Sequence, residues 1–128
     1  MGVVLHHTIV RAADKSVSAR FFAGLLGLRV GHPVGPFLPV AVNDELTLDF
    51  DDRTPGVAGH FGFLVDDATF DALLARVCAD QDIPFGSGPE HGWDRTINRL
   101  AGGRGVYVAD PDGHSHEFFT APSPAKLS

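Results

Sequence analysis

The sequence predicts an α+β protein made of two copies of one β-α-β-β-β module. Apolar residues alternate with period two in several short segments and recur at helical spacing in two longer ones, which indicates strands and two amphipathic helices. The order of these segments repeats after 53 positions, so that His7 aligns with His60 and Asp14 aligns with Asp67 at the start of a helix. This repeat predicts two successive modules of similar structure.

The first module is expected at about residues 1–55. It opens with an alternating segment at 3–10, which predicts a strand. Asp14 then stands at the N-cap position of a helix, and Gly27 follows the last apolar residue of that helix as its expected C-cap. Clusters of glycine and proline separate three further expected strands, at 28–32, 37–42 and 45–51.

The second module is expected at about residues 57–121. It restarts with a strictly alternating segment at 60–65, and Asp66 and Asp67 then open a helix with an amphipathic pattern. The apolar positions of this helix include Cys78, which is therefore expected as a core thiol. Further strands are expected at 83–86, 103–109 and 114–120.

The second module also carries an insertion. Asp49 and Glu117 occupy corresponding last strands but lie 68 positions apart, which is 15 more than the repeat of 53. The polar stretch at 87–100 has turn residues and no clear period, so we expect the insertion there. A loop of this length in a compact domain is usually functional or disordered.

Composition excludes several classes of protein. A chain of 128 residues predicts one domain over 1–128. The net charge of −6 and the lack of a basic cluster argue against a nucleic-acid partner. One cysteine cannot form an internal disulfide, and the longest apolar run, at 21–28, is too short to cross a bilayer. With no signal-peptide pattern at the start, these features predict a soluble, cytoplasmic protein without a membrane partner.

Strand alternation gathers three residues that could bind a metal. The large apolar residues of 60–65 must cover the helix, so His60 points to the opposite face, and Glu117 takes that face in the last strand. His7 is the repeat equivalent of His60. Two imidazoles and a carboxylate suit a divalent transition metal, and Asp49 could be a fourth ligand. The alternatives are ordinary hydrogen-bonded histidines and, for Asp49, an acidic strand end.

The insertion and a nearby strand supply candidate substrate-binding residues. Trp93 offers a flat apolar surface, Arg95 and Arg99 could hold an anionic group, and His91 could transfer protons. Tyr107 is expected on a strand beside the site. In the alternative reading the loop is solvated, the tryptophan merely packs, and the tyrosine hydroxyl only satisfies a buried polar end.

Three segments of the sequence form a recognisable set: Leu-His-His-Thr-Ile-Val at 5–10, Gly-His-Phe at 59–61, and Asp-Pro-Asp-Gly-His-Ser-His-Glu at 110–117. Together they resemble the vicinal oxygen chelate superfamily, which includes glyoxalase I, fosfomycin resistance enzymes, extradiol dioxygenases, methylmalonyl-CoA epimerase and bleomycin-binding proteins. The resemblance covers nearly the whole chain. It implies two modules wrapped into an open, mostly antiparallel, barrel-like sheet with the helices outside, usually in a homodimer.

The resemblance also implies a metal site. His7, His60 and Glu117 match the family's ligands on the first, fifth and eighth strands. Asp49 aligns with the fourth-strand position, which is a glutamate in members similar to glyoxalase I, so its shorter side chain argues mildly against a standard glyoxalase I. The implied cofactor is a divalent metal ion: zinc, nickel, manganese or iron(II).

Two main functions follow from the resemblance. In the first, the chain is a metal-dependent enzyme in which His60 and Glu117 are catalytic and the metal chelates oxygens of a small-molecule substrate. Its chemistry would be that of an isomerase or lyase, an epimerase, a thiol transferase or an extradiol-type dioxygenase. In the second, the chain sequesters an antibiotic or another aromatic ligand without catalysis, and Trp93 stacks on the ligand. A regulatory domain with a vestigial triad is a third, weaker possibility.

Overall fold

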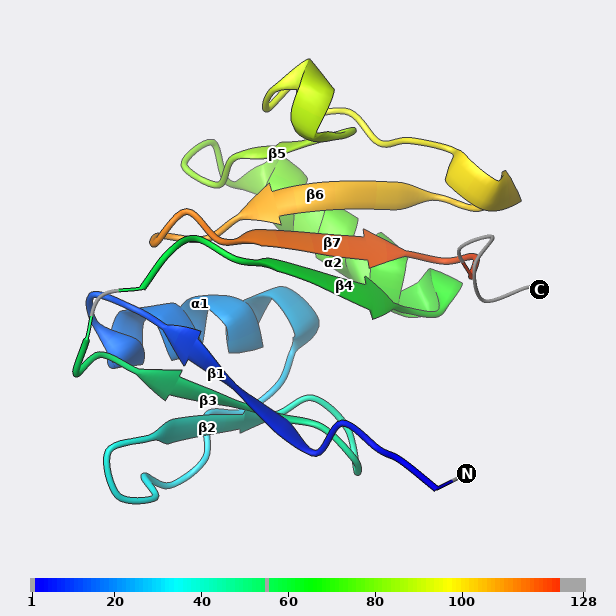
Figure 1. Ribbon diagram of the computed structural model, residues 1–128. Helices are drawn as coiled ribbons and strands as arrows, with labels where there is room; N and C mark the ends of the chain where they lie inside the picture. The colour runs from blue at the N-terminus through cyan, green and yellow to red at the C-terminus, as the bar shows by residue number, and fades with distance from the viewer. Residues whose placement is uncertain (1, 55, 123–128) are drawn as a thin grey trace. The chain divides into compact units, whose positions relative to one another are not determined.

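The structure is a computed structural model that describes residues 2–54 and 56–122. The chain divides into two compact units, Met1–Val57 and Ala58–Ser128, and each contains one helix and one sheet (Figure 1). Within the described residues, no helix has the length and apolar character needed to cross a membrane. Each unit is considered by itself below.

The first unit has a three-stranded sheet in the order β1-β3-β2. Strand β3 lies in the middle, parallel to β1 and antiparallel to β2. The elements are β1 (His7–Arg11), α1 (Lys15–Leu26), β2 (Leu38–Ala41) and β3 (Thr47–Asp51). Helix α1 packs its buried residues, Phe22 among them, against the sheet face that carries Leu48 and Phe50. The two phenylalanine rings lie 6.2 Å apart, at the centre of this unit's core.

Both predicted caps of helix α1 are confirmed. The Asp14 carboxylate accepts hydrogen bonds from the backbone N–H groups of Ser16 and Val17, at 2.9 and 3.2 Å. Gly27 ends the helix in the left-handed conformation, with φ of 66°, where a residue without a β-carbon has no steric penalty. The helix bounds therefore follow from local backbone chemistry.

The strand predicted at 28–32 is wrong. These residues have no strand conformation, and Gly31 donates one backbone hydrogen bond of 2.8 Å to the Pro39 carbonyl. Pro39 has no N–H to return, so a continuous ladder cannot form beside β2 at this position. The first unit is therefore β-α-β-β. The first strand is also shorter than predicted, since it begins at His7.

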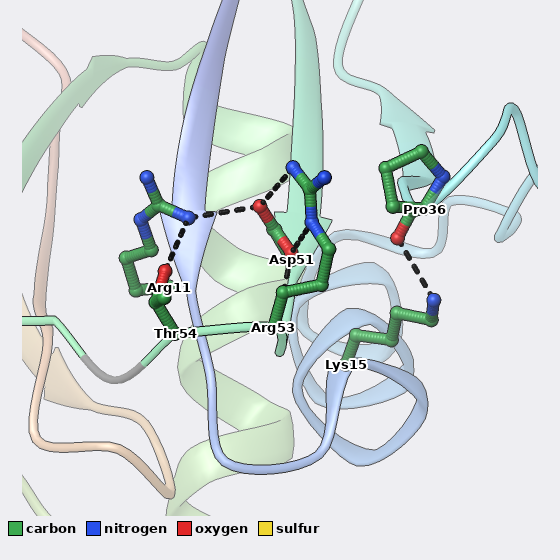
Figure 2. Close-up of polar contacts among 6 residues, drawn as sticks. All are labelled: Arg11, Lys15, Pro36, Asp51, Arg53 and Thr54. Carbon is green, nitrogen blue, oxygen red and sulfur yellow. Dashed lines mark hydrogen bonds and ion pairs between the residues drawn. The ribbon is translucent and has the colours of Figure 1, made fainter.

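A buried carboxylate joins the ends of β1 and β3 (Figure 2). Asp51 is fully buried, and its carboxylate accepts hydrogen bonds from Arg11 Nη1 at 2.8 Å and from Arg53 Nη2 at 3.0 Å. The hydrogen bond from the Arg53 side chain is the main cause that lowers the pKa of Asp51 to about 2. Arg11 also donates to Thr54 Oγ1, and Lys15 Nζ donates to the Pro36 carbonyl. This cluster fixes the chain after β3.

The second unit has a four-stranded sheet in the order β4-β7-β6-β5. Strand β4 is parallel to β7, and the other two pairings are antiparallel. The elements are β4 (His60–Leu64), α2 (Asp67–Ala79), β5 (Phe85–Gly86), the 3-10 turns η1 (Pro89–His91) and η2 (Leu100–Gly102), β6 (Gly105–Ala109) and β7 (Ser115–Phe119). Asp66 caps α2 by accepting from the Thr69 N–H at 2.7 Å.

Helix α2 buries a narrower stripe than the sequence predicts. Phe70, Leu73 and Val77 are fully buried in the unit's core, together with residues of β5, β6 and β7. Cys78, expected in the core, is exposed, because it lies one helical position beyond Val77 and points away from the buried stripe. The prediction of a core thiol is therefore wrong.

The α+β class is confirmed: each unit has one helix and one mixed sheet. Among the described residues, three of the five strand pairings are antiparallel, which agrees with a mostly antiparallel arrangement. The hydrogen bonds between the described strands close no barrel. One domain over 1–128 stays a prediction.

Candidate functional site

Strand register in the second unit places a polar row across one sheet face. Gly62 of β4 and Tyr107 of β6 both lie opposite Glu117 of the central strand β7. His60 lies two residues before Gly62 and therefore projects from the same face. The neighbouring residues of β7, His116 and Phe118, point to the other face and are fully buried in the core. The row therefore lies on the face that α2 does not cover.

The side chains of His60 and Glu117 meet on this face. His60 Nε2 lies 3.0 Å from Glu117 Oε1, and the exposed fractions of the two side chains are 52% and 21%. Gly62 has no side chain to fill the space beside this contact. A β-carbon at this position would lie 3.9 Å from Glu117 Oε1, at an ordinary van der Waals distance. The imidazole and carboxylate are thus paired and accessible to a small molecule.

Tyr107 completes the row. Its ring packs edge-on against the His60 ring with 5.7 Å between centroids. Burial is the main cause that raises the pKa of Tyr107, and the negative charge of the neighbouring Glu117 carboxylate adds to it. The phenol therefore stays protonated at neutral pH beside the carboxylate.

The donor atoms of His60 and Glu117 fit a divalent metal. Two ligands about 2.1 Å from a metal and at right angles to each other lie about 3.0 Å apart. The observed separation of 3.0 Å matches this spacing and equally matches an N–H···O hydrogen bond in the absence of a metal. Within the described residues, no group of three or more histidine, cysteine or acidic side chains is arranged to hold a metal. The row therefore offers two candidate ligands.

The remaining predicted ligands, His7 and Asp49, lie in the first unit. In its sheet, Ile9 of β1 and Pro39 of β2 both lie opposite Asp49 of β3. Asp49 is therefore the counterpart of Glu117, and His7 is the counterpart of His60. His7 is exposed, and its Nδ1 lies 2.9 Å from Nδ1 of His6. The roles of His7 and Asp49 as ligands stay predictions.

Hydrogen bonds hold the insertion in a defined conformation next to β6. The Asp94 carboxylate accepts from the backbone N–H and the hydroxyl of Ser87 at 2.9 and 2.7 Å, and from the Thr96 N–H at 3.3 Å. The Ser87 hydroxyl contributes most to lowering the pKa of Asp94 to about 2. Asn98 and Gly105 exchange two backbone hydrogen bonds, which attach the end of the insertion to β6.

The structure separates the predicted substrate-binding residues into two groups. Trp93 and Tyr107 line a cavity of about 200 Å³, and His91 and Tyr107 line another of about 320 Å³. Arg95 has a different environment: its guanidinium donates to the carbonyls of Ile83 and Val77 at 2.9 and 3.0 Å. These bonds hold the insertion against the end of α2. Arg99 is exposed at the start of η2.

A third cavity, of about 490 Å³, adjoins Glu117 and was not predicted from the sequence. Its lining is mainly apolar, with Asn98 and Glu117 as polar members. The residues are Gly62, Asn98, Leu100, Ala101, Glu117, Phe119 and Ala121. One signal for it was present in the sequence: Gly62 interrupts an apolar strand two positions after His60, and a glycine inside a strand often marks the close approach of a ligand.

Comparisons with known proteins agree with this architecture. No protein-family model matches the chain, and no curated protein matches it. The oxidase ChaP-H1 is 44% identical, with 94% of this chain and 98% of that one covered and a TM-score of 0.85. The oxidase ChaP-H2 is 40% identical, with coverages of 97% and 98% and a TM-score of 0.87.

More distant structures share the fold alone. Lactoylglutathione lyase from Agrobacterium tumefaciens is 22% identical, with 94% of each chain covered and a TM-score of 0.69. The two units with equivalent register, the sequence pattern at 110–117 and the identity to the two oxidases lead to one conclusion: the chain belongs to the vicinal oxygen chelate superfamily, the glyoxalase/bleomycin resistance/dioxygenase fold family.

Proposed function

We propose that this protein is a metal-dependent enzyme that oxidises a small organic molecule with dioxygen. The observation that carries the proposal is the pair His60 and Glu117, whose donor atoms lie 3.0 Å apart on an accessible sheet face beside a cavity of about 490 Å³. The reaction class is supported by identities of 40% and 44% to two proteins named oxidases. Iron(II) is the proposed metal, because two histidines and one carboxylate with open positions suit dioxygen chemistry.

Each residue has a distinct role in this proposal. His60 provides a neutral nitrogen ligand and Glu117 an anionic oxygen ligand, while Tyr107 packs against the His60 ring and lies opposite Glu117, which restricts the movement of both side chains. The third ligand, His7, enters the proposal from the sequence resemblance alone. When bound, the metal supplies Lewis-acid and one-electron redox chemistry. The mainly apolar cavity binds the body of the substrate, and Asn98 offers a hydrogen bond.

The test measures metal content and dioxygen uptake. Untagged protein loaded anaerobically with iron(II) is expected to hold about one metal per chain. His60→Ala is expected to weaken metal binding by roughly a hundredfold. His32→Ala is the matched control, because His32 is an exposed histidine outside the row. If the chain binds none of iron(II), manganese, nickel or zinc, the proposal is wrong.

Reaction class is tested by comparing metals. Dioxygen uptake with a panel of catechols and related phenols is expected for the iron(II) form and not for the zinc form. Turnover by the zinc form without dioxygen uptake would instead indicate isomerase or lyase chemistry. The two loaded forms contain the same protein, so differences in folding do not affect this comparison.

Ligand sequestration is the second candidate function. One observation favours it: Trp93 is 48% exposed, yet it lines a cavity together with Tyr107, as expected for a ring that stacks on an aromatic ligand. If Trp93→Ala abolishes binding of an aromatic antibiotic while His60→Ala leaves it unchanged, sequestration is favoured. Loss of turnover in His60→Ala favours catalysis.

A further inference from the structure

A buried polar cluster lies at the start of β7, on the core side of the second unit's sheet. It consists of Asp110, His114 and His116, all of which are buried. Asp110 Oδ1 accepts from the backbone N–H groups of Asp112 and His114, each at 2.9 Å, and Asp110 Oδ2 lies 3.1 Å from His116 Nε2. Burial alone would raise the pKa of Asp110, but the hydrogen bond and charge of His116 keep it lowered. The cluster is therefore held together by an ionised carboxylate.

His114 connects this cluster to β4. Its Nδ1 accepts a hydrogen bond of 2.7 Å from the backbone N–H of Gly59, the residue directly before His60. The Gly59 carbonyl in turn accepts from the Ser115 N–H at 2.9 Å. Both backbone groups of Gly59 are thus held by residues at the start of β7. Because Nδ1 is the acceptor, His114 must be unprotonated at this nitrogen.

The residue after His60 is held by the same cluster. The Phe61 ring stacks on His116, with 5.5 Å between centroids and 19° between planes. It also packs edge-on against His114 at 5.8 Å. The Gly59 backbone before His60 and the Phe61 ring after it are therefore both held on the core side of the sheet, while the His60 side chain lies on the opposite face next to Glu117.

The turn before β7 places His114 for this contact. The Gly113 N–H donates to the Asp110 carbonyl at 3.1 Å, and Gly113 has φ of 82°, a conformation that favours glycine. The Asp110 side chain then fixes the His114 backbone. Residues 110–114 therefore have a structural role, the placement of His114, which is distinct from the role of the candidate ligand Glu117 that follows them.

We propose that His114 is a positioning residue for His60: its Nδ1 holds the Gly59 N–H and thereby sets the backbone from which the imidazole reaches Glu117. Loss of this acceptor leaves the Gly59 N–H without its partner and loosens the start of β4. The His60 ring then samples positions away from Glu117. The metal consequence rests on the proposed function, whereas the effect on the His60 ring does not.

Two variants separate the acceptor from the ring. His114→Asn places its amide oxygen at the position of Nδ1, so it keeps the acceptor but loses the ring. His114→Phe keeps a ring against Phe61 but has no acceptor. A merely structural role for a buried ring predicts that the phenylalanine variant is the better tolerated of the two. The positioning role predicts the opposite order for every readout of His60.

The experiment measures zinc affinity by calorimetry and, in metal-free protein, the NMR signals of the His60 ring and of the Gly59 amide. We expect His114→Phe to weaken zinc binding about tenfold, within the range found for residues that orient ligands, and His114→Asn to stay within about twofold of the parent. In metal-free protein, His114→Phe is expected to shift the His60 signals and accelerate exchange of the Gly59 amide. Urea midpoints monitor folding of both variants.

The outcomes separate the two proposals. Equal His60 signals and equal zinc affinity in both variants, or a loss that follows the urea midpoint, would overturn the positioning role. If the parent protein binds no zinc or other divalent metal, the proposed function fails. The metal-free NMR comparison then decides the positioning role by itself.

Discussion

The two units present the same backbone row with different side chains. Each row runs across three strands, with the central residue on the last strand of its unit and one partner on each side. Level with the carboxylate, the row of the second unit holds Gly62, Glu117 and Tyr107, and that of the first unit holds Ile9, Asp49 and Pro39. The histidines, His60 and His7, lie two residues before Gly62 and Ile9. A comparison of the two rows shows how the neighbours of a carboxylate on a sheet decide whether it can serve as a candidate ligand.

The neighbours of the carboxylate account for the difference. Glu117 is longer than Asp49 by one methylene, faces an open position at Gly62, and lies opposite Tyr107, a side chain with a polar hydroxyl. Asp49 lies between a branched aliphatic residue and a proline, which offers no side-chain donor. The second unit therefore offers the stronger candidate ligand of the two carboxylates, although the backbones are equivalent.

The largest expected effect concerns the two cores. Phe50 and Phe118 occupy equivalent core positions, and both are fully buried. Replacing either by alanine is expected to lower the free energy of unfolding by about 3–5 kcal/mol, because it removes a large apolar contact and leaves a cavity. Urea unfolding monitored by circular dichroism measures both. A loss below about 1 kcal/mol in one variant would show that its ring is not part of a packed core.

The next prediction compares the carboxylates. Glu117→Gln is expected to reduce iron(II) affinity roughly a hundredfold, because it removes the anionic ligand, whereas Asp49→Asn changes affinity less than about threefold. Anaerobic calorimetry measures both, and thermal unfolding confirms that each variant is folded. Equal losses in the two variants would show that Asp49 is also a ligand and that the comparison above is wrong.

Gly62 tests the open position in the row. Gly62→Ile copies the first unit's Ile9 and is expected to raise the KM about tenfold, because the side chain enters the space beside Glu117 and Phe119. Gly62→Ala is the control, since its β-carbon would make only ordinary contacts, 3.5 Å from Phe119. Steady-state kinetics distinguishes the two variants. An unchanged KM in Gly62→Ile would place the substrate elsewhere.

The smallest effect is a pH dependence in the first unit. The pKa of Asp51 is lowered from 3.8 to about 2 in the folded protein, so this carboxylate contributes stability above pH 4 that is lost as the pH falls towards 2. The urea midpoint of the parent protein is expected to fall in that interval, and Asp51→Asn is expected to weaken this dependence of the midpoint on pH. An equal pH dependence in the two proteins would contradict the assignment of the effect to Asp51.

Local chemistry explains which parts of the fold could be predicted. The carboxylates of Asp14 and Asp66 cap the helices at the predicted places, because a cap depends on neighbouring N–H groups. The absent strand at 28–32 depends instead on Pro39, which lies in another strand. Helical spacing predicts Cys78 in the core, but it is exposed, because the width of the buried stripe depends on what the helix packs against.

In the candidate site, too, the features that depend on local sequence could be predicted, and those that depend on distant parts of the chain could not. Alternation along single strands brought His60 and Glu117 to one face, whereas the cavities depend on how the insertion folds back on β6. Arg95 illustrates the limit of composition: an arginine in a polar loop suggests an anion site, yet its guanidinium binds the carbonyls at the end of α2. Such backbone acceptors leave no pattern in the sequence.

The most direct test of the proposed metal role of His60 and Glu117 is anomalous X-ray diffraction from crystals soaked with iron(II) or manganese(II) under anaerobic conditions. We predict one anomalous peak within about 2.3 Å of both His60 Nε2 and Glu117 Oε1. A peak at other residues, or crystals that hold no metal while His60 and Glu117 keep their contact of 3.0 Å, would contradict the account.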